Sequence, residues 1–136
     1  MSEQTQDSAP TFYPFLRYAD ARAAVEWLCD AFGFERQSVF DAPDGTVAHA
    51  ELRLGSGMVM LGQSKDDALG LRTPRELGAV TGGVYAYVPD ADAHHARAVA
   101  AGAEIVLPLK EMGYGSREYS CRDPEGNLWS FGTYRP

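Results

Sequence analysis

A histidine and a glutamate share one strand-like segment with an arginine, a set that could carry acid–base chemistry. In TVAHAELRL, residues 46–54, His49, Glu51 and Arg53 alternate with apolar residues and so share one face of a strand. An imidazole or carboxylate beside a guanidinium can abstract a proton next to a carbonyl group, because the arginine stabilises the developing negative charge. The His49–Glu51 pair could equally orient a ligand or form a two-ligand metal corner, although no third donor follows on that face.

Aromatic and methionine side chains are predicted on the same kind of face in other segments. Alternation along the strands in FYPFLRY, MVMLG and GVYAYV groups Tyr13, Phe15, Arg17, Met58, Met60, Tyr85 and Tyr87 with His49, Glu51 and Arg53. Such a mixture is unusual for a solvent face and is typical of a ligand pocket, with a sheet–sheet or dimer contact as the alternative. Tyr114 and Arg117 flank a glycine-containing loop at a sheet mouth, where binding residues are common, so we include them in the candidate site.

These segments belong to a pattern that occurs twice. A short strand ends at an aspartate, an amphipathic alanine-rich helix follows, and a glycine ends it, over residues 20–33 and again over residues 90–102. The apolar period then changes from 3.6 to 2, which predicts further strands and a β-α-β-β-β order in each half. We place a disordered leader at 1–10, the first module at 11–64, a connector at 65–80 and the second module at 81–136.

The apolar residues of opposite parity are predicted to pack beneath the helices. On the segment 46–54 these are Ala48, Ala50, Leu52 and Leu54, whereas Val47 is expected on the face that carries His49. Trp129 and Phe131 occupy alternate positions on the last strand that face the core, and Trp27 lies on the apolar stripe of the first helix. Asp123 is expected to hold its turn through its own side chain.

Composition excludes several classes of function. The chain has 136 residues, 45% of them apolar and 23% charged, as in an ordinary soluble single domain. Twelve basic against nineteen acidic residues give a net charge of −7, which argues against a nucleic-acid or membrane-surface partner. No segment has the length of a bilayer-spanning helix. Two widely separated cysteines fit no metal or redox motif, so we expect reduced thiols and a cytoplasmic location.

The chain resembles the glyoxalase/bleomycin-resistance/dioxygenase superfamily, also called the vicinal oxygen chelate fold. The resemblance rests on the paired modules, on YADARAAVEWLCDAFGFE and, most specifically, on DPEGNLWSFGTY, which is most like the uncharacterised glyoxalase-like branch. It implies an α+β fold in which two tandem βαβββ modules form curled mixed sheets around a concave cleft, in one domain overall. It also implies a homodimer.

Metal-dependent members of that superfamily bind a divalent ion with His, Gln or Glu from four strands. Counting along this sequence, the resemblance puts those positions at Tyr13, Met60, Gly83 or its neighbour, and Ser130. None of them is a usual ligand for such an ion. We therefore expect no metal and no other cofactor.

Three functions remain open at this stage. We favour a metal-free protein, similar to the antibiotic-binding and antibiotic-resistance members, that binds a small, partly aromatic and possibly cationic molecule, with Glu51 as its anionic anchor. The alternative is an isomerase, lyase or epimerase of this fold, with or without a metal, that uses His49 or Glu51 as general base. The third is a protein-interaction surface.

Overall fold

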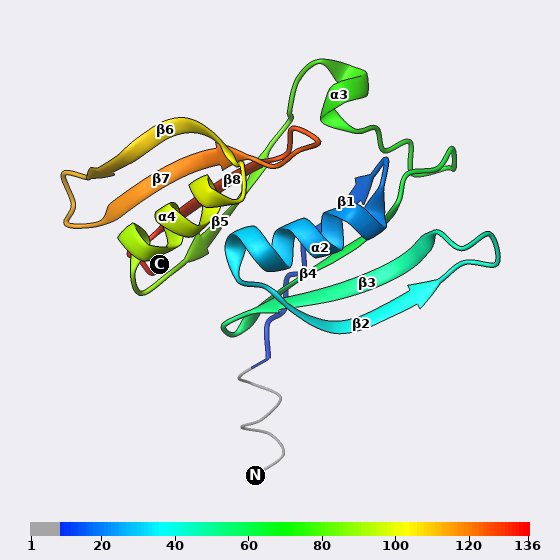
Figure 1. Ribbon diagram of the computed structural model, residues 1–136, viewed down its shortest axis with the longest axis horizontal. Helices are drawn as coiled ribbons and strands as arrows, with labels where there is room; N and C mark the ends of the chain where they lie inside the picture. Colours follow the sequence, from blue (N-terminus) through cyan, green and yellow to red (C-terminus); the bar gives the residue numbers. More distant parts are fainter. Residues whose placement is uncertain (1–8) are drawn as a thin grey trace, which may run out of the picture.

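The computed structural model describes residues 9–136, so the expected leader lies outside the described residues apart from Ala9 and Pro10. The predicted α+β fold with tandem βαβββ modules is confirmed (Figure 1). The first module contains β1 (Phe15–Tyr18), α2 (Ala21–Phe32), β2 (Glu35–Asp41), β3 (Val47–Leu54) and β4 (Gly57–Gln63). The second contains β5 (Gly83–Tyr87), α4 (Ala91–Ala100), β6 (Glu104–Glu111), β7 (Arg117–Arg122) and β8 (Leu128–Gly132). A short helix that the pattern did not predict, α3 (Pro74–Leu77), lies in the connector.

Each module forms a four-stranded mixed sheet, ordered β1-β4-β3-β2 and β5-β8-β7-β6. The first strand of each module pairs in parallel with the last, and the other pairs are antiparallel. Figure 1 shows α2 and α4 beside each other on the same side of the molecule, each over its own sheet. We call the side of each sheet away from its helix the open face. The longest helix has 12 residues, so no helix in the described part of the chain could span a bilayer.

Local sequence signals explain where the helices begin and end. Asp20 accepts a hydrogen bond from the Ala23 N–H and Asp90 from the Ala93 N–H, so both aspartates cap their helices as predicted. Gly33 ends α2 in the left-handed conformation, at a φ of 83°, which a residue with a Cβ rarely adopts. The repeated Asp-to-Gly spacing therefore does define two equivalent helices.

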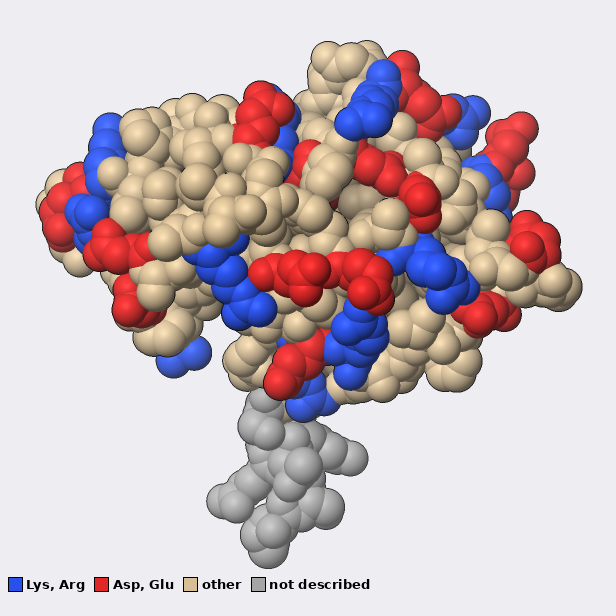
Figure 2. Space-filling view, viewed as in Figure 1, with Lys and Arg blue, Asp and Glu red and all other residues tan. Residues whose placement is uncertain are grey.

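The apolar core lies between the helices and the sheets. Trp129 and Phe131 are fully buried there, as predicted, and Phe32 from the other module packs on both rings at centroid distances of 5.4 Å and 4.6 Å. The outer surface of the helices is different in character. Figure 2 shows acidic and basic side chains interspersed over it, as expected for an ordinary solvated face.

The prediction for the start of β3 was wrong. Val47 is 1% exposed and belongs to the core, whereas Ala48 is exposed. The cause is a register shift where β2 meets β3: Phe40 pairs with His49, but the next residue, Asp41, pairs with Val47. Such a bulge adds one residue to a strand and reverses the alternation beyond it. Ala50 and Leu52, past the bulge, are buried as expected.

A buried carboxylate joins the two modules. Asp123, which is 4% exposed, begins the turn between β7 and β8. Its Oδ2 accepts hydrogen bonds from the Tyr18 hydroxyl of β1 at 2.7 Å and from the Trp129 indole N–H of β8 at 3.1 Å. Its Oδ1 accepts from the backbone N–H groups of Glu125 and Asn127, both at 3.0 Å, which confirms its expected role in the turn. A buried carboxylate needs such donors in place of water, and here both modules provide them.

The same turn also fixes the start of the first helix. The two carboxylate oxygens of Glu125 accept hydrogen bonds from the backbone N–H groups of Ala19 at 2.6 Å and Asp20 at 2.9 Å. These groups lie immediately before α2, where a negative charge is favourable because the helix dipole is positive there. A turn of the second module therefore sets where a helix of the first one begins.

The carboxyl ends of the two helices are tied to each other. Arg97 of α4 donates hydrogen bonds to the carbonyl oxygens of Asp30 at 2.7 Å and Cys29 at 3.1 Å, in the last turn of α2. In return, the half-buried Trp27 of α2 donates from its indole nitrogen to the carbonyl of Ala101 at 2.9 Å, just after α4. The last carbonyl groups of a helix have no partner within it, so these bonds satisfy them and hold the modules together.

His94 adds a third tie between the helices. Its Nε2 lies 2.9 Å from the carbonyl oxygen of Phe32, and its Nδ1 lies 2.6 Å from the Tyr119 hydroxyl. A carbonyl only accepts, so Nε2 carries the hydrogen and Nδ1 accepts from the phenol. Burial lowers the pKa of His94, which keeps the imidazole neutral.

We expect Asp123→Ala to destabilise the protein strongly. The change leaves the Tyr18 hydroxyl, the Trp129 N–H and two backbone N–H groups without their acceptor, at about 1–3 kcal/mol for each unsatisfied buried group before relaxation. The free energy of unfolding, measured with urea, should fall by about 3 kcal/mol or more. Tyr18→Phe removes one donor only and should cost about 1–2 kcal/mol. Equal effects of the two variants would contradict the assigned role of Asp123.

We also expect a pH dependence of stability that originates at His94. The unfolded imidazole takes up a proton near pH 6.5 and the folded one only at lower pH, so the unfolded state binds more protons between these two values. The free energy of unfolding should therefore decrease as the pH falls below about 6.5. His94→Gln should flatten this slope between pH 7.5 and pH 5, with His95→Gln as the control for loss of one histidine. An unchanged slope in His94→Gln would show that His94 is not its source.

Candidate functional site

Predicted ligand-binding residues of the first module lie on one surface. Phe15, Met60 and Glu51 are cross-strand partners in a single row of the first sheet. Arg53 and Met58 are partners in a neighbouring row, with the same parity. The open face of this sheet therefore brings together side chains from β1, β3 and β4.

The polar residues of this face form a hydrogen-bonded network. His49 Nε2 lies 3.0 Å from Glu51 Oε2, and Gln37 donates to Glu51 Oε1 at 3.2 Å. Arg53 donates in turn to the Gln37 amide oxygen, and Phe40 stacks on the His49 ring. The hydrogen bond with His49 is the main cause that lowers the pKa of the Glu51 carboxyl. A general base works best with a pKa near the working pH, so this lowered pKa makes Glu51 a weak base at neutral pH.

Arg17 has an unsatisfied donor. Its side chain is 14% exposed, and Nη2 donates to Asp67 of the connector at 3.2 Å. The other terminal nitrogen, Nη1, is buried and has no hydrogen-bond partner among the described residues. Buried guanidinium N–H groups are almost always paired, so an orphaned one calls for an explanation.

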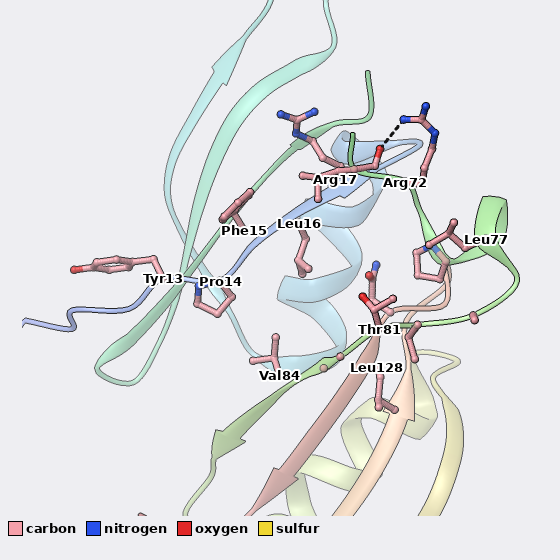
Figure 3. Close-up of a pocket in the computed structure, with 17 residues that line it drawn as sticks. Tyr13, Pro14, Phe15, Leu16, Arg17, Arg72, Leu77, Thr81, Val84 and Leu128 are labelled. Carbon is pink, nitrogen blue, oxygen red and sulfur yellow. Dashed lines mark hydrogen bonds between the residues drawn. The ribbon is translucent and has the colours of Figure 1, made fainter. Parts of the chain in front are cut away.

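Arg17 lies at a groove between the modules. A cavity of about 390 Å³ is lined by β1, the connector and the start of β5 (Figure 3). It includes the predicted Tyr13, Phe15 and Arg17, and in Figure 3 Phe15 and Arg17 point to the opposite side of β1 from Leu16. The connector contributes lining that the sequence did not single out: Leu71, Arg72, Pro74, Leu77, Ala79, Val80 and Thr81. Except for Pro74 and Leu77 in the four-residue helix α3, which is too short to show a helical period, they lie outside regular elements, so the sequence pattern did not indicate them.

A second groove, of about 280 Å³, gathers a different group of predicted residues. Met58, Tyr85 and Tyr87 line it, together with Phe12, Phe34 and Arg135 among others. The Arg135 guanidinium lies over the Tyr87 ring, 4.1 Å from its centroid. Met58 comes from the first module and the two tyrosines from the second, so this groove also crosses between modules.

The remaining predicted residues lie elsewhere. Arg117 is on the helix side of the second sheet, where it donates to both carboxylate oxygens of Asp92 in α4 at 3.0 Å and 3.1 Å. Tyr114 packs edge-on against Tyr134, with ring centroids 5.6 Å apart. Arg117 is two residues before the buried Tyr119 on β7, so both side chains lie on the helix side of the sheet. The loop before Arg117, on which the prediction was based, does not indicate this.

The four positions that correspond to metal ligands in the superfamily do not fit a divalent ion. Tyr13 donates its hydroxyl to the Pro10 carbonyl at 2.7 Å, and the Ser130 hydroxyl lies 2.6 Å from that of Ser120. Met60 offers a thioether and Gly83 no side chain at all. No group of three or more His, Cys, Asp or Glu residues with metal-binding geometry lies within residues 9–136.

The cysteines are poorly suited to nucleophilic chemistry. Both Cys29 and Cys121 are buried and carry free thiols. Burial raises the pKa of the Cys121 thiol to about 12, so it stays protonated at neutral pH. The thiolate is the reactive form, so neither the sequence nor the structure points to cysteine catalysis.

Comparison with known proteins agrees with this architecture. The uncharacterized proteins Mb0911c of Mycobacterium bovis and Rv0887c of Mycobacterium tuberculosis are each 34% identical over 125 residues, covering 90% of this chain and 82% and 74% of theirs. TioX from Micromonospora sp. ML1 is 35% identical, and its crystal structure aligns with a TM-score of 0.75 over 93% of this chain and 98% of TioX.

A second solved structure shows the same fold at lower identity. The bleomycin-binding protein of Streptomyces verticillus, crystallised with copper(II)-bleomycin, aligns with a TM-score of 0.64 at 24% identity over 91% of this chain and 95% of that one. The family model of the Glyoxalase/Bleomycin resistance protein/Dioxygenase superfamily matches residues 11–131. With nearly the whole chain covered by that match, the protein belongs to the Glyoxalase/Bleomycin resistance protein/Dioxygenase superfamily.

Proposed function

We propose that this protein binds a small, partly aromatic molecule between its modules without a metal ion and without transforming it. The binding surface consists of the open faces and the two grooves. Its aromatic members are Tyr13, Phe15, Tyr85 and Tyr87, its flexible members Met58 and Met60, and its polar members Arg17, His49, Glu51 and Arg53. Aromatic faces stack on planar groups and methionines adapt to irregular shapes.

The unsatisfied Nη1 of Arg17 is the observation that carries this proposal. An unpaired buried donor destabilises a folded protein, so a ligand acceptor toward which the Arg17 side chain turned on binding would gain a charge-assisted hydrogen bond from Nη1. Phe15, two residues earlier on the same face, is 53% exposed and lines the same groove. An acceptor-bearing aromatic ring matches this combination of a donor and an exposed ring.

The relatives support binding as a function of this fold. One member with the same fold is a bleomycin-binding protein, crystallised with copper(II)-bleomycin. The net charge of −7 would attract a cationic ligand at long range. A role in antibiotic resistance through sequestration is consistent with both features.

We further propose that the protein acts as a homodimer in the cytoplasm. The homodimer is what the resemblance to the superfamily implies, and a two-fold pair is the commonest assembly of soluble proteins. Free cysteines are typical of a reducing compartment.

The enzymatic alternative, an isomerase, lyase or epimerase with His49 or Glu51 as base, has less support. The Glu51 carboxylate is held in its ionised form by His49, and its pKa is lowered rather than raised toward neutrality. His49 is bonded to this carboxylate and stacked by Phe40. The network fits a role in orienting a ligand better than a role in proton abstraction.

Removal of the exposed ring of Phe15 should weaken binding. We expect wild-type protein to bind acriflavine or metal-free bleomycin saturably in isothermal titration. Phe15→Ala should raise Kd by about 2- to 12-fold, which corresponds to the 0.5–1.5 kcal/mol typical of an aromatic pair. Val99→Ala is the matched control, because Val99 is also an exposed apolar residue but lies on α4.

Two results would count against the proposal. Equal loss of affinity in Phe15→Ala and Val99→Ala would show that the ligand does not bind at the open face. Absence of saturable binding of either compound would favour a protein-interaction surface instead.

Purified protein should contain no stoichiometric transition metal. The four corresponding positions offer no suitable donor set, so elemental analysis should give well below one Zn, Ni, Mn or Fe atom per chain. Addition of EDTA should leave the acriflavine Kd unchanged. A stoichiometric metal that resists dialysis would overturn the metal-free assignment and raise the enzymatic alternative above it.

A further inference from the structure

Next to Tyr85, the second sheet carries further side chains, Tyr114, Tyr134 and Glu118, to which the proposed binding surface gives no role. Tyr114 and Tyr134 contact each other edge-on, and the Tyr85 hydroxyl donates to the Tyr134 carbonyl at 2.6 Å. The three rings are 59%, 48% and 38% exposed, for Tyr114, Tyr134 and Tyr85 in that order. With Glu118 of β7 they form what we call the tyrosine–glutamate cluster.

A glycine allows the members of this cluster to approach one another. Glu118 and Gly132 are cross-strand partners on β7 and β8. A Cβ placed on Gly132 would lie 2.5 Å from Glu118 Cγ and 2.8 Å from the Tyr85 hydroxyl oxygen. Both side chains therefore lean over the glycine toward each other. The pKa of the Tyr114 phenol is raised, chiefly by its hydrogen bond with the Glu118 carboxylate, which places a third member beside the same charge.

No cationic side chain neutralises Glu118. It makes no ion pair with any Lys, Arg or His among residues 9–136. Lys110 is its cross-strand partner on β6 and shares its face of the sheet, but no ion pair joins the two side chains. Arg117 is bonded to Asp92 on the other face of the sheet, and Arg135 lies over the Tyr87 ring.

The corresponding carboxylate of the first sheet, that of Glu51, differs in its hydrogen bonding. Glu51 is already bonded to His49 and Gln37. A positive group that approached it would have to compete with the imidazole and the amide. Glu118, by contrast, has the Tyr85 hydroxyl and the Tyr114 phenol near it, and the rings of such residues attract cations within about 6 Å of the ring centre.

We propose that the tyrosine–glutamate cluster, Tyr85, Tyr114, Tyr134 and Glu118, is a subsite for an organic cation, so that ligands of this protein carry an ammonium group beside their aromatic part. This inference rests on the proposed small-molecule binding. It moves the anionic anchor of the ligand from Glu51, where the sequence alone would place it, to Glu118. A carboxylate next to ring faces binds an alkylammonium group through charge and cation–π attraction together.

Two isosteric probes test this assignment. The 4-hydroxyphenyl-trimethylammonium ion and 4-tert-butylphenol have nearly the same shape and differ in charge. In NMR titrations of wild-type protein, we expect the cation to bind about fivefold or more tightly than the neutral phenol. Glu118→Gln should remove this preference without changing the affinity for 4-tert-butylphenol.

A matched variant separates local from long-range charge. Glu104→Gln removes one exposed carboxylate from β6 of the same sheet and should keep the wild-type preference. Tyr114→Leu, at a residue exposed enough to leave folding intact, should reduce the preference about two- to threefold.

The possible failures have different meanings. Binding of both probes with equal affinity would overturn the cation subsite and leave the proposed small-molecule binding in place. If Glu118→Gln and Glu104→Gln lost the preference for the cation equally, net charge alone would explain that preference. This result would also contradict the cation subsite. A change in the sedimentation coefficient of Glu118→Gln would show that the cluster is a contact between copies. If neither probe bound saturably, both the cation subsite and the proposed small-molecule binding would be contradicted.

Discussion

The structure depends on one buried negative charge. The Asp123 carboxylate lies where β1 of the first module approaches β8 of the second, and it is tolerated there because a phenol, an indole and two backbone N–H groups replace its water. Burial and the neighbouring carboxylate raise the pKa of Tyr18, so its hydroxyl remains a donor at neutral pH. Of these donors only the Tyr18 hydroxyl comes from the first module, so it is this hydrogen bond that requires one relative placement of the modules. The carboxylate therefore sets the geometry of both grooves, which run between those modules, as well as the stability of the turn.

All the polar ties between the modules lie on the helix side. Arg97, Trp27 and His94 satisfy carbonyl groups at helix ends, and Glu125 satisfies N–H groups at a helix start. Within residues 9–136 no comparable hydrogen bond links the open faces, where Phe15 and Tyr85 are exposed. This division explains how one chain combines a well-ordered core with a surface that can bind a ligand. On the helix side, Arg97, Trp27 and His94 are used for these ties and for packing.

Sequence patterns predicted the features that periodicity and helix capping determine, namely the helices and the faces of most strands. The Asp-to-Gly spacing located both helices, and alternation placed Phe15, Met60 and Glu51 on one face. Val47 was misplaced because a bulge depends on how β2 and β3 pair, which no single strand reveals. The connector residues around Leu71 and Leu77 line a groove without any period, and Arg117 turns to the helix side because Asp92 is there. Glu118 was overlooked for a similar reason, since one glutamate in a strand is ordinary until Gly132 and three tyrosines are seen around it.

The two halves of this duplicated scaffold have diverged in charge as well as in shape. On the first sheet His49 is bonded to Glu51 and Arg17 is paired with Asp67 of the connector, with the Nη1 group of Arg17 left without an acceptor among the described residues. On the second sheet the Glu118 carboxylate lies near the Tyr85 hydroxyl and makes no ion pair within residues 9–136. One half therefore offers a hydrogen-bond donor and the other an anion. A duplicated site with identical halves would accept a ligand in two equivalent orientations. Unequal halves instead favour different ligand groups, an acceptor at Arg17 and a cation at Glu118.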